Sequence, residues 1–373
     1  MSKEYTCLGL MSGTSGDGVD ASIVRSDGQD KFTVIKERYY EYDKSIFYDF
    51  HELKNKINSY NDLNTHSLKI KELEKKITLF NAKIIKDISS NISLDLIGFH
   101  GQTIYHNPDE KISNQLGNGI LLSQLTKIKT VFNFRKNDIL NGGEGAPLTP
   151  IFHKYLIKSK KINLPAAILN IGGISNMTYL YDFKDNKILS KDLGPGNCLI
   201  DQWIQKHTKK KFDDEGKISE RGIVNEIILE QALELYENNF KKKNNISLDT
   251  NDFDLSFARG LSIEDGAATL IKFTSKIIAS NIDLFLKDFL NKNIKVIICG
   301  GGRKNLNLIK QIKLYTNKNL SFYSSEEYSL EGDFIESQAF AYLAIRSVLS
   351  LPISFPQTTG CSSPCTGGEI INY

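Results

Sequence analysis

The sequence runs through Cys7-Leu8-Gly9-Leu10-Met11-Ser12-Gly13-Thr14-Ser15-Gly16-Asp17-Gly18-Val19-Asp20 and then into the apolar run Ala21–Val24. The apolar residues at its start predict a short strand, and the second apolar run predicts another. Between them, glycines alternate with hydroxyl and carboxylate side chains. Glycine lets the backbone approach an anion closely, and consecutive N–H groups there can form an anion-binding nest. The stretch therefore predicts a strand, a phosphate-binding turn and a strand, which points to nucleotide chemistry.

The same arrangement returns in the second half of the chain. An apolar strand at Ala166–Asn170 meets Gly172-Gly173 and continues into a strand at Met177–Tyr181. The other predicted strands are Tyr5–Leu10, Ala21–Arg25, Phe32–Tyr40, Leu94–Phe99, Thr130–Phe134, Ile188–Lys191 and Lys295–Cys299, and the main predicted helices lie at about 64–90, 262–290 and 334–349. This repetition predicts duplicated α/β domains. We place the boundary near Leu164-Pro165, which gives domains of residues 1–165 and 166–373.

Composition is typical of a soluble globular protein. Hydrophobic residues make up 40% of the 373 and charged residues 24%, and the net charge is +3. Such a balanced charge favours neither nucleic acid nor an anionic membrane as a partner. No apolar run approaches the roughly 18 residues that a membrane-spanning helix needs. The N-terminus enters a strand without a secretory signal, so we expect a cytoplasmic protein.

Two local patterns suggest extra chemistry but are better explained as loops. Lys241-Lys242-Lys243-Asn244-Asn245 favours a solvated, helix-terminating loop over a nucleic-acid contact. Cys361 and Cys365 enclose Ser-Ser-Pro, but no second cysteine pair or nearby histidine accompanies them, so the pattern favours a loop over a metal pair. The five cysteines are scattered, as expected of reduced thiols rather than a disulfide framework.

Three glycine turns in order are more specific than any one of them. A Gly-Thr-Ser turn comes early, Gly172-Gly173 comes mid-chain, and Gly300-Gly301-Gly302 follows a late apolar strand. The chain resembles the actin, Hsp70 and sugar-kinase superfamily. That resemblance implies an α/β fold with two RNase H-like (actin-like ATPase) domains flanking an ATP cleft. Met11 and Asn170 stand where the superfamily usually carries aspartates, which indicates a divergent branch.

Eight ordered motifs over nearly the whole chain indicate which branch this is. They are Gly9–Asp20, His100–Thr103, Phe134–Asp138, Gly142–Leu148, Asn170–Asn176, Asp192–Asn197, Cys299–Gly302 and Gly332–Phe340. With them, the chain resembles the anhydro-N-acetylmuramic acid kinase family. Gly16, Leu193 and Asn118 depart from the residues usual in that family.

The resemblance implies a coupled reaction. Water opens the 1,6-anhydro ring of anhydro-N-acetylmuramic acid while O6 receives the γ-phosphoryl group of ATP, giving N-acetylmuramic acid 6-phosphate and ADP. The expected cofactors are ATP and Mg²⁺, because phosphoryl transfer needs charge neutralisation at the phosphates. The expected partners are small-molecule substrates, with neither nucleic acid nor membrane, and a homodimer is expected from the resemblance.

The reaction needs one carboxylate, which acts as the general base that activates the water. It needs no second carboxylate as an acid, because phosphoryl transfer takes up the charge that develops on the leaving O6. Asp192 is our candidate for this catalytic base. It follows a short strand and precedes the rigid turn Gly194-Pro195-Gly196-Asn197. The structural alternative is an aspartate that caps the turn by binding nearby amides.

The other candidate residues bind ATP or the sugar. For ATP they are Gly13, Thr14, Ser15, Gly16, Asp17, Gly18, Val19, Asp20, Gly172, Gly173, Gly300, Gly301 and Gly302, and for the sugar they are His100, Arg135, Asp138 and Glu336. Asp17 or Asp20 can approach the metal through water, although Asp20 is equally explained as a strand-edge carboxylate. Arg135 can pair with a carboxylate or phosphate, or else form a surface ion pair with Asp138. His100 can instead be a structural histidine whose hydrogen bonds are satisfied within the protein. Glu336 can instead lie on the solvent face of its helix.

Two other functions stay open from the sequence. One is a kinase for an ordinary sugar hydroxyl, in which Asp192 deprotonates the alcohol. The other is an ATP-binding chaperone or filament protein without sugar chemistry, which fits poorly with the His100–Thr103 and Asp192–Asn197 motifs. Incorporation of solvent ¹⁸O at C1 separates ring opening from simple phosphorylation.

Overall fold

The computed structural model describes residues 3–240 and 247–373 and divides the chain into two compact units. The first unit comprises Met1–Lys161, Phe183–Ile188 and Asp333–Tyr373, and the second comprises Ile162–Asp182 and Leu189–Gly332. The predicted lysine-rich loop at 241–245 lies outside the described residues.

The sheet of the first unit has seven strands in the described part of the chain. Their order is β12-β6-β4-β1-β2-β3, and β5 pairs with β4. β1, β2 and β3 form an antiparallel meander from three of the predicted strands, whereas β4 is parallel to both β1 and β6. The bounds are β1 (Tyr5–Ser12), β2 (Gly18–Ser26), β3 (Phe32–Glu41), β4 (Leu96–Asn107), β5 (Ile112–Leu116), β6 (Lys129–Phe132) and β12 (Glu369–Ile371).

The sheet of the second unit has five strands among the described residues, in the order β11-β10-β7-β8-β9. β7 pairs antiparallel with β8, and β10 is parallel to both β7 and β11. The bounds are β7 (Ala166–Ile171), β8 (Ile174–Leu180), β9 (Ile188–Pro195), β10 (Ile294–Cys299) and β11 (Leu320–Ser324).

The two sheets share one topology. In each, the first three strands lie in chain order on one side, and the next two parallel strands extend the sheet on the other: β6-β4-β1-β2-β3 corresponds to β11-β10-β7-β8-β9. The expected α/β class with two duplicated RNase H-like domains is therefore confirmed.

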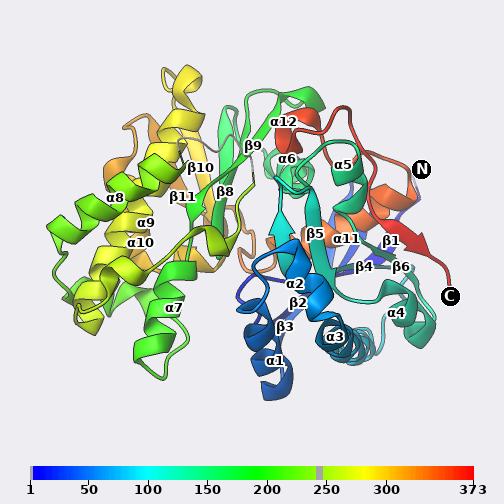
Figure 1. Ribbon diagram of the computed structural model, residues 1–373. Helices are drawn as coiled ribbons and strands as arrows, with labels where there is room; N and C mark the ends of the chain where they lie inside the picture. The colour runs from blue at the N-terminus through cyan, green and yellow to red at the C-terminus, as the bar shows by residue number, and fades with distance from the viewer. Residues whose placement is uncertain (1–2, 241–246) are drawn as a thin grey trace. The chain divides into compact units, whose positions relative to one another are not determined.

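Helices pack against each sheet (Figure 1). Those of the first unit are α1 (Lys44–Lys54), α2 (Tyr60–Thr65), α3 (Ser67–Ile88), α4 (Gly119–Thr126), α5 (Lys136–Leu140), α6 (Pro150–Ser159), α11 (Ile335–Val348) and α12 (Pro356–Thr359). Those of the second unit are α7 (Cys198–His207), α8 (Glu226–Phe240), α9 (Ile263–Phe285) and α10 (Leu306–Tyr315). The long α9 is capped by Ser262, the residue before its first turn, whose side chain accepts the amide of Asp265.

The two faces of β1 are packed in different ways. Successive side chains of a strand point to opposite faces. Leu8 and Leu10 are buried in one core cluster with residues of α1 and α3. Gly9 lies against α11, because a Cβ at Gly9 would come within 1.9 Å of the Ser337 carbonyl oxygen. Gly98, its register partner on β4, is covered in the same way by the Phe340 carbonyl oxygen at 2.4 Å. The backbone of α11 therefore rests on two adjacent glycines.

This packing corrects the expected division at 165/166. The chain does change unit close to that point, between Lys161 and Ile162, but it returns to the first unit at Asp333. The segment from Asp333 onward, including α11, belongs with residues 1–161 because its helix packs on β1, β2 and β4. Helix periodicity cannot reveal this, since it marks the apolar face of α11 but not the sheet that receives it.

The three departures from the family pattern each have a local cause. Gly16 has a φ of +63°, and a Cβ there would meet the ring of Phe50 at 2.2 Å. Asn118 caps α4 by accepting the amide of Leu121 at 2.8 Å. Leu193 is fully buried in the core of the second unit. Within the described residues, no helix combines the length and the apolar character that crossing a membrane requires.

Candidate active site

The first glycine turn connects β1 to β2. The amide of Gly16 donates to the carbonyl of Gly13 at 3.2 Å, which closes the turn and leaves Thr14 and Ser15 exposed. The Ser15 hydroxyl donates to Oδ1 of Asp17 at 2.7 Å. The predicted anion-binding turn thus presents hydroxyls to solvent beside a carboxylate.

The turn is anchored from behind by groups that the sequence analysis did not single out. Nε2 of Gln102, a fully buried side chain on β4, donates to the Gly13 carbonyl at 2.8 Å. The backbone carbonyl of Asp17 accepts the amide of Tyr42 at 2.9 Å and the hydroxyl of Tyr39 at 3.1 Å. The only sequence signal for Gln102 was its place in the His100–Thr103 motif.

The second and third glycine turns meet within the second unit. The amides of Gly196 and Asn197 donate to the carbonyls of Gly173 and Gly172, at 2.8 and 2.7 Å. A Cβ at Gly196 would lie 2.2 Å from the Gly172 oxygen, so only glycine permits this contact. Gly302 is equally close to Ile171, where its Cβ would be 2.3 Å from Cγ2. Three segments far apart in sequence therefore form one glycine-lined surface.

Asp192 lies on β9, just before the turn that carries Gly196. Its side chain is 9% exposed, and Oδ2 accepts the backbone amide of Leu248 at 2.7 Å. This bond reaches a segment that is distant in sequence, which a capping role within the adjacent turn does not explain. The Leu248 amide thus orients the Asp192 carboxylate on the strand that leads into Gly196, the glycine that contacts the second glycine turn.

His100, Arg135 and Glu336 come together in the first unit. Arg135 donates through Nη1 to the Gly145 carbonyl at 2.8 Å, and its Nη2 lies 2.9 Å from Nε2 of His100. Nδ1 of His100 lies 2.8 Å from the Gly101 carbonyl. These partners assign the proton to Nδ1 and make Nε2 the acceptor, so the ring is neutral.

The electrostatics of this cluster agree with its hydrogen bonds. Burial, and then the Arg135 guanidinium, hold the pKa of His100 well below its usual value. Burial raises the pKa of Glu336, and Arg135 opposes that rise. Arg135 is therefore the positive centre of a partly desolvated cluster, a setting in which a cation binds carboxylate or phosphate strongly.

Asp138 differs from the other predicted sugar-binding residues. It is 1% exposed, its Oδ2 accepts the Gly145 amide at 2.7 Å, and its Oδ1 accepts the Thr359 hydroxyl at 2.6 Å. Such burial excludes a surface ion pair with Arg135. These bonds favour a role in holding the segment whose Gly145 carbonyl binds Arg135.

The comparison with known proteins covers the whole chain. The sequence model described as anhydro-N-acetylmuramic acid kinase matches residues 5–373. The chain belongs to the anhydro-N-acetylmuramic acid kinase family. The anhydro-N-acetylmuramic acid kinase of Pelagibacter ubique is 52% identical over 376 residues and covers 100% of both chains. The enzyme of that name from Zymomonas mobilis is 36% identical over 371 residues, covering 97% of this chain and 98% of its own.

A distant likeness to a solved structure is also found. A ROK family glucokinase from Streptomyces griseus, in complex with glucose and AMPPNP, covers 91% of this chain and 99% of its own, at 10% identity and a TM-score of 0.42. That similarity is too low to add to the family assignment.

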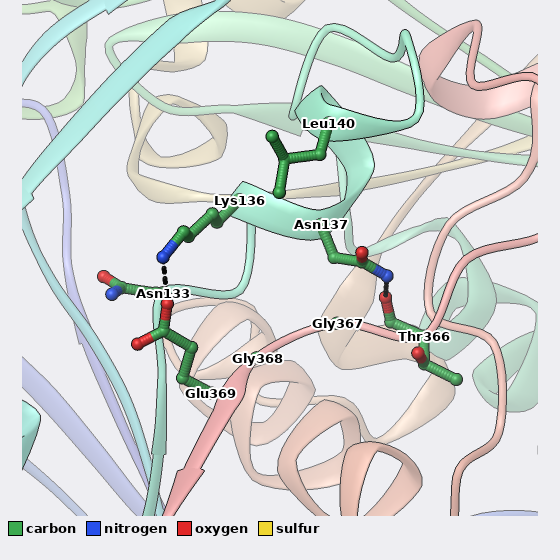
Figure 2. Close-up of a pocket in the computed structure, with 8 residues that line it drawn as sticks. All are labelled: Asn133, Lys136, Asn137, Leu140, Thr366, Gly367, Gly368 and Glu369. Atoms are coloured by element: carbon green, nitrogen blue, oxygen red, sulfur yellow. Dashed lines mark hydrogen bonds and ion pairs between the residues drawn. The ribbon is translucent and has the colours of Figure 1, made fainter.

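A surface hollow near α5 is separate from these residues (Figure 2). Across it, Lys136 forms an ion pair with Glu369, and Nδ2 of Asn137 donates to the Thr366 carbonyl. Its lining consists of Asn133, Lys136, Asn137, Leu140, Thr366, Gly367, Gly368 and Glu369. None of the candidate residues of this kinase-family chain lines the hollow, so we assign it no part in the site.

The buried histidines predict an acid-dependent loss of stability. A histidine whose pKa falls on folding binds protons first in the unfolded chain, so the free energy of unfolding decreases as the pH falls below about 6.5. Each such group contributes a slope of up to about 1.4 kcal/mol per pH unit until its folded-state pKa is reached. We expect His100→Gln to flatten this decline between about pH 6.5 and 5 in urea-unfolding measurements.

His153 on α6 supplies the matched variant. Burial lowers its pKa to about 3, and it lies outside the candidate site. His153→Gln should flatten the same curve while leaving sugar binding unchanged. An unaltered slope in His100→Gln would contradict the neutral, buried assignment of that ring.

Proposed function

We propose that this protein uses ATP to open the 1,6-anhydro ring of anhydro-N-acetylmuramic acid and to phosphorylate O6, in the recycling of cell-wall amino sugars. Family membership over residues 5–373 supports the substrate. The observation that carries the chemistry is the position of Asp192, a buried carboxylate held by the Leu248 amide on the strand that leads into Gly196, which contacts the second glycine turn.

In the proposed reaction, Asp192 accepts a proton from water as the water oxygen bonds to C1 of the sugar. The C1–O6 bond breaks, and O6 bonds to the γ-phosphorus of ATP, releasing ADP. Asp192 is suited to this role because a fixed carboxylate spends no free energy on reorientation during the reaction. Ring opening needs no protein acid at O6, since the phosphoryl group takes up the developing charge.

ATP is proposed to bind through the three glycine turns. Backbone N–H groups and the exposed hydroxyls of Thr14 and Ser15 suit phosphate oxygens. Gly300 and Gly302 pack against Asn170 and Ile171, which leaves the exposed Gly301 as open backbone that suits the flat face of a nucleoside. The first turn and the other two lie in different units of the chain.

The first turn also fits the expected Mg²⁺. Its donor set is hard oxygen, with Asp17 and Asp20 beside hydroxyls, and Mg²⁺ prefers oxygen ligands while keeping several waters. The described residues contain no group of three acidic or imidazole ligands here, so phosphate and water would supply the remaining coordination. Bound Mg²⁺ supplies charge neutralisation at the phosphates. A homodimer and a cytoplasmic location also stay predictions.

The sugar is proposed to meet the cluster of His100, Arg135 and Glu336. The Arg135 guanidinium is oriented by the Gly145 carbonyl and the neutral His100 ring, which suits a bidentate pair with the lactyl carboxylate. Glu336 is half-buried near Arg135 and suits a sugar hydroxyl. Asp138 is proposed to act indirectly, by fixing the Gly145 segment.

The decisive experiment is incubation of the protein with ATP, Mg²⁺ and anhydro-N-acetylmuramic acid in H₂¹⁸O, followed by mass spectrometry. We expect sugar-dependent ADP release and a 6-phosphate product that carries one solvent ¹⁸O at C1. Phosphorylation without ¹⁸O would indicate a kinase for an ordinary hydroxyl, and ATP binding without sugar-stimulated turnover would indicate a non-enzymatic relative. Either result would overturn the proposal.

Gln102 gives a separate prediction about the first turn. Gln102→Leu keeps the side-chain volume but removes the donor to the Gly13 carbonyl, whose loss costs about 1–3 kcal/mol when the acceptor stays buried. We expect KM for ATP to rise roughly tenfold, with kcat at saturating ATP nearly unchanged, in steady-state assays. Thr103→Val, at the next position of β4, is the control and should leave KM for ATP as it is. A fall in kcat alone would contradict a positioning role for Gln102.

A further inference from the structure

Two cysteines of the C-terminal segment and one carboxylate of α5 lie together in the first unit. One ligand atom each from Asp138, Cys361 and Cys365 lies within 4.8 Å of the other two, and all three side chains are buried. Among the described residues, this is the only group of three His, Cys, Asp or Glu side chains placed so closely. Cys361 and Cys365 are free thiols.

The loop that carries the cysteines is held in place by its backbone. Cys365 and Ser354 form an antiparallel bridge, in which the Cys365 amide donates to the Ser354 carbonyl at 3.0 Å. The Ser362 amide donates to the Asn141 carbonyl, just beyond α5, at 3.0 Å. The thiols of Cys361 and Cys365 both point at the Ser363 carbonyl oxygen, at 3.2 and 3.0 Å. Two sulfur atoms and a carbonyl oxygen therefore converge on one point.

Asp138 lies on α5, far earlier in the chain than the two cysteines, and its carboxylate reaches the same place. The Thr359 hydroxyl holds its Oδ1 at 2.6 Å. Each carboxylate oxygen has two lone pairs, so these bonds leave acceptor capacity toward a cation. The side chain is fixed before any ligand arrives, which lowers the entropic cost of binding.

We propose that Cys361, Cys365 and Asp138 bind one Zn²⁺ ion, with the Ser363 carbonyl oxygen or a water as the fourth ligand. Thiolates select thiophilic ions over Mg²⁺ and Ca²⁺, which require oxygen ligands. Tetrahedral Zn–S and Zn–O bonds of about 2.0–2.3 Å place ligand atoms about 3.3–3.8 Å apart. No present separation exceeds 4.8 Å, so the ligand atoms need to move together by at most about 1.5 Å, within the reach of side-chain rotation.

Binding must displace two thiol protons to solvent. Burial raises the pKa of Cys361, and it raises that of Cys365 to about 12; the nearby Asp138 carboxylate acts in the same direction. Protons therefore compete with the metal, and Zn²⁺ affinity should rise with pH. The three residues between the two cysteines, Ser362, Ser363 and Pro364, are exposed, so the site lies next to solvent.

A metal here would tie the C-terminal segment to α5. That helix begins directly after Arg135, and Asp138 holds the Gly145 segment that orients the Arg135 guanidinium. The ion would thus fix Asp138, and through it the Gly145 segment that orients Arg135, without contacting the sugar. The inference does not depend on the proposed kinase activity, because metal binding is measured without ATP or sugar.

The test uses the full chain, reduced with a thiol-free reductant and freed of metal. Titration with Zn²⁺ by calorimetry should give one site per chain, and Co²⁺ should produce the near-ultraviolet charge-transfer band of thiolate ligands. Cys361→Ser and Cys365→Ser should each weaken Zn²⁺ binding by more than about 100-fold and abolish the band. Cys7→Ala removes a buried thiol elsewhere and should leave both unchanged.

The cobalt band on the unmodified chain keeps the proposal testable if a serine variant fails to fold. A reduced wild-type chain that binds no Zn²⁺ and shows no cobalt band would overturn it. So would Zn²⁺ binding that survives both serine substitutions. Loss of two thiols to a Cys361–Cys365 disulfide in air, with no metal bound after reduction, would reassign the pair to redox chemistry.

Discussion

Replacing Asp192 by asparagine is expected to lower kcat by about 10³-fold, within the range that general base catalysis contributes. Asparagine keeps the size of the side chain and an oxygen that can accept the Leu248 amide, so the turn before Gly196 should keep its structure. It cannot take up a proton from water. We expect sugar-dependent ADP release in a coupled assay to fall to this extent, while ATP binding measured by calorimetry stays near that of the wild type.

Asp254→Asn provides the matched control. Asp254 is an exposed carboxylate of the same unit that accepts the Ser256 amide. Its replacement should leave both turnover and ATP binding unaltered. Turnover of Asp192→Asn within a fewfold of wild type would reject the assignment of the base, whereas loss of ATP binding would show a structural role for this carboxylate.

Gly9→Ala should strongly lower the free energy of unfolding of the first unit. Its Cβ would lie 1.9 Å from the Ser337 carbonyl oxygen and 2.6 Å from the Ala341 amide nitrogen, both backbone atoms of α11. Backbone cannot move aside as a flexible side chain can, so α11 must separate from β1. We expect a loss of about 3 kcal/mol or more in the free energy of unfolding, measured by urea denaturation.

Gly13→Ala is the companion variant, four residues along the chain. Its Cβ would meet only the Ser15 hydroxyl oxygen, at 3.7 Å, an ordinary contact distance. We expect a change of less than about 0.5 kcal/mol in the free energy of unfolding. Equal stabilities of the two variants would show that α11 does not rest on β1 as described.

Most of the elements were predictable because they depend on local patterns. The meander β1–β3, the strand at β10 and the long α9 lie close to their expected bounds, since apolar alternation and helical periodicity mark buried faces directly. The place of α11 was not predictable. Its sequence shows a buried helix, but only the glycines at positions 9 and 98, brought into register on β1 and β4, show what it packs against.

The candidate site divides in the same way. Glycines mark places where the backbone approaches another group closely, so the three turns could be found from the sequence. The structure shows why glycine is needed at Gly196, where a Cβ would collide with the Gly172 carbonyl oxygen of the second turn. Gln102 was missed because its function is a single hydrogen bond to a carbonyl, which no residue pattern records. The pairing of Arg135 with a neutral His100 also depends on burial, which a sequence does not show.

The sequence by itself determined the duplicated α/β architecture, the glycine turns, the candidate base and the family, because each is carried by residue types at fixed spacing along the chain. The tertiary structure alone decided which distant segments meet: α11 on the glycines of β1 and β4, the Leu248 amide on Asp192, and Asp138 beside Cys361 and Cys365. Those contacts are tertiary contacts between segments that lie far apart in the chain. Spacing along the chain carries no information about such encounters, whereas burial and backbone geometry in the folded protein do.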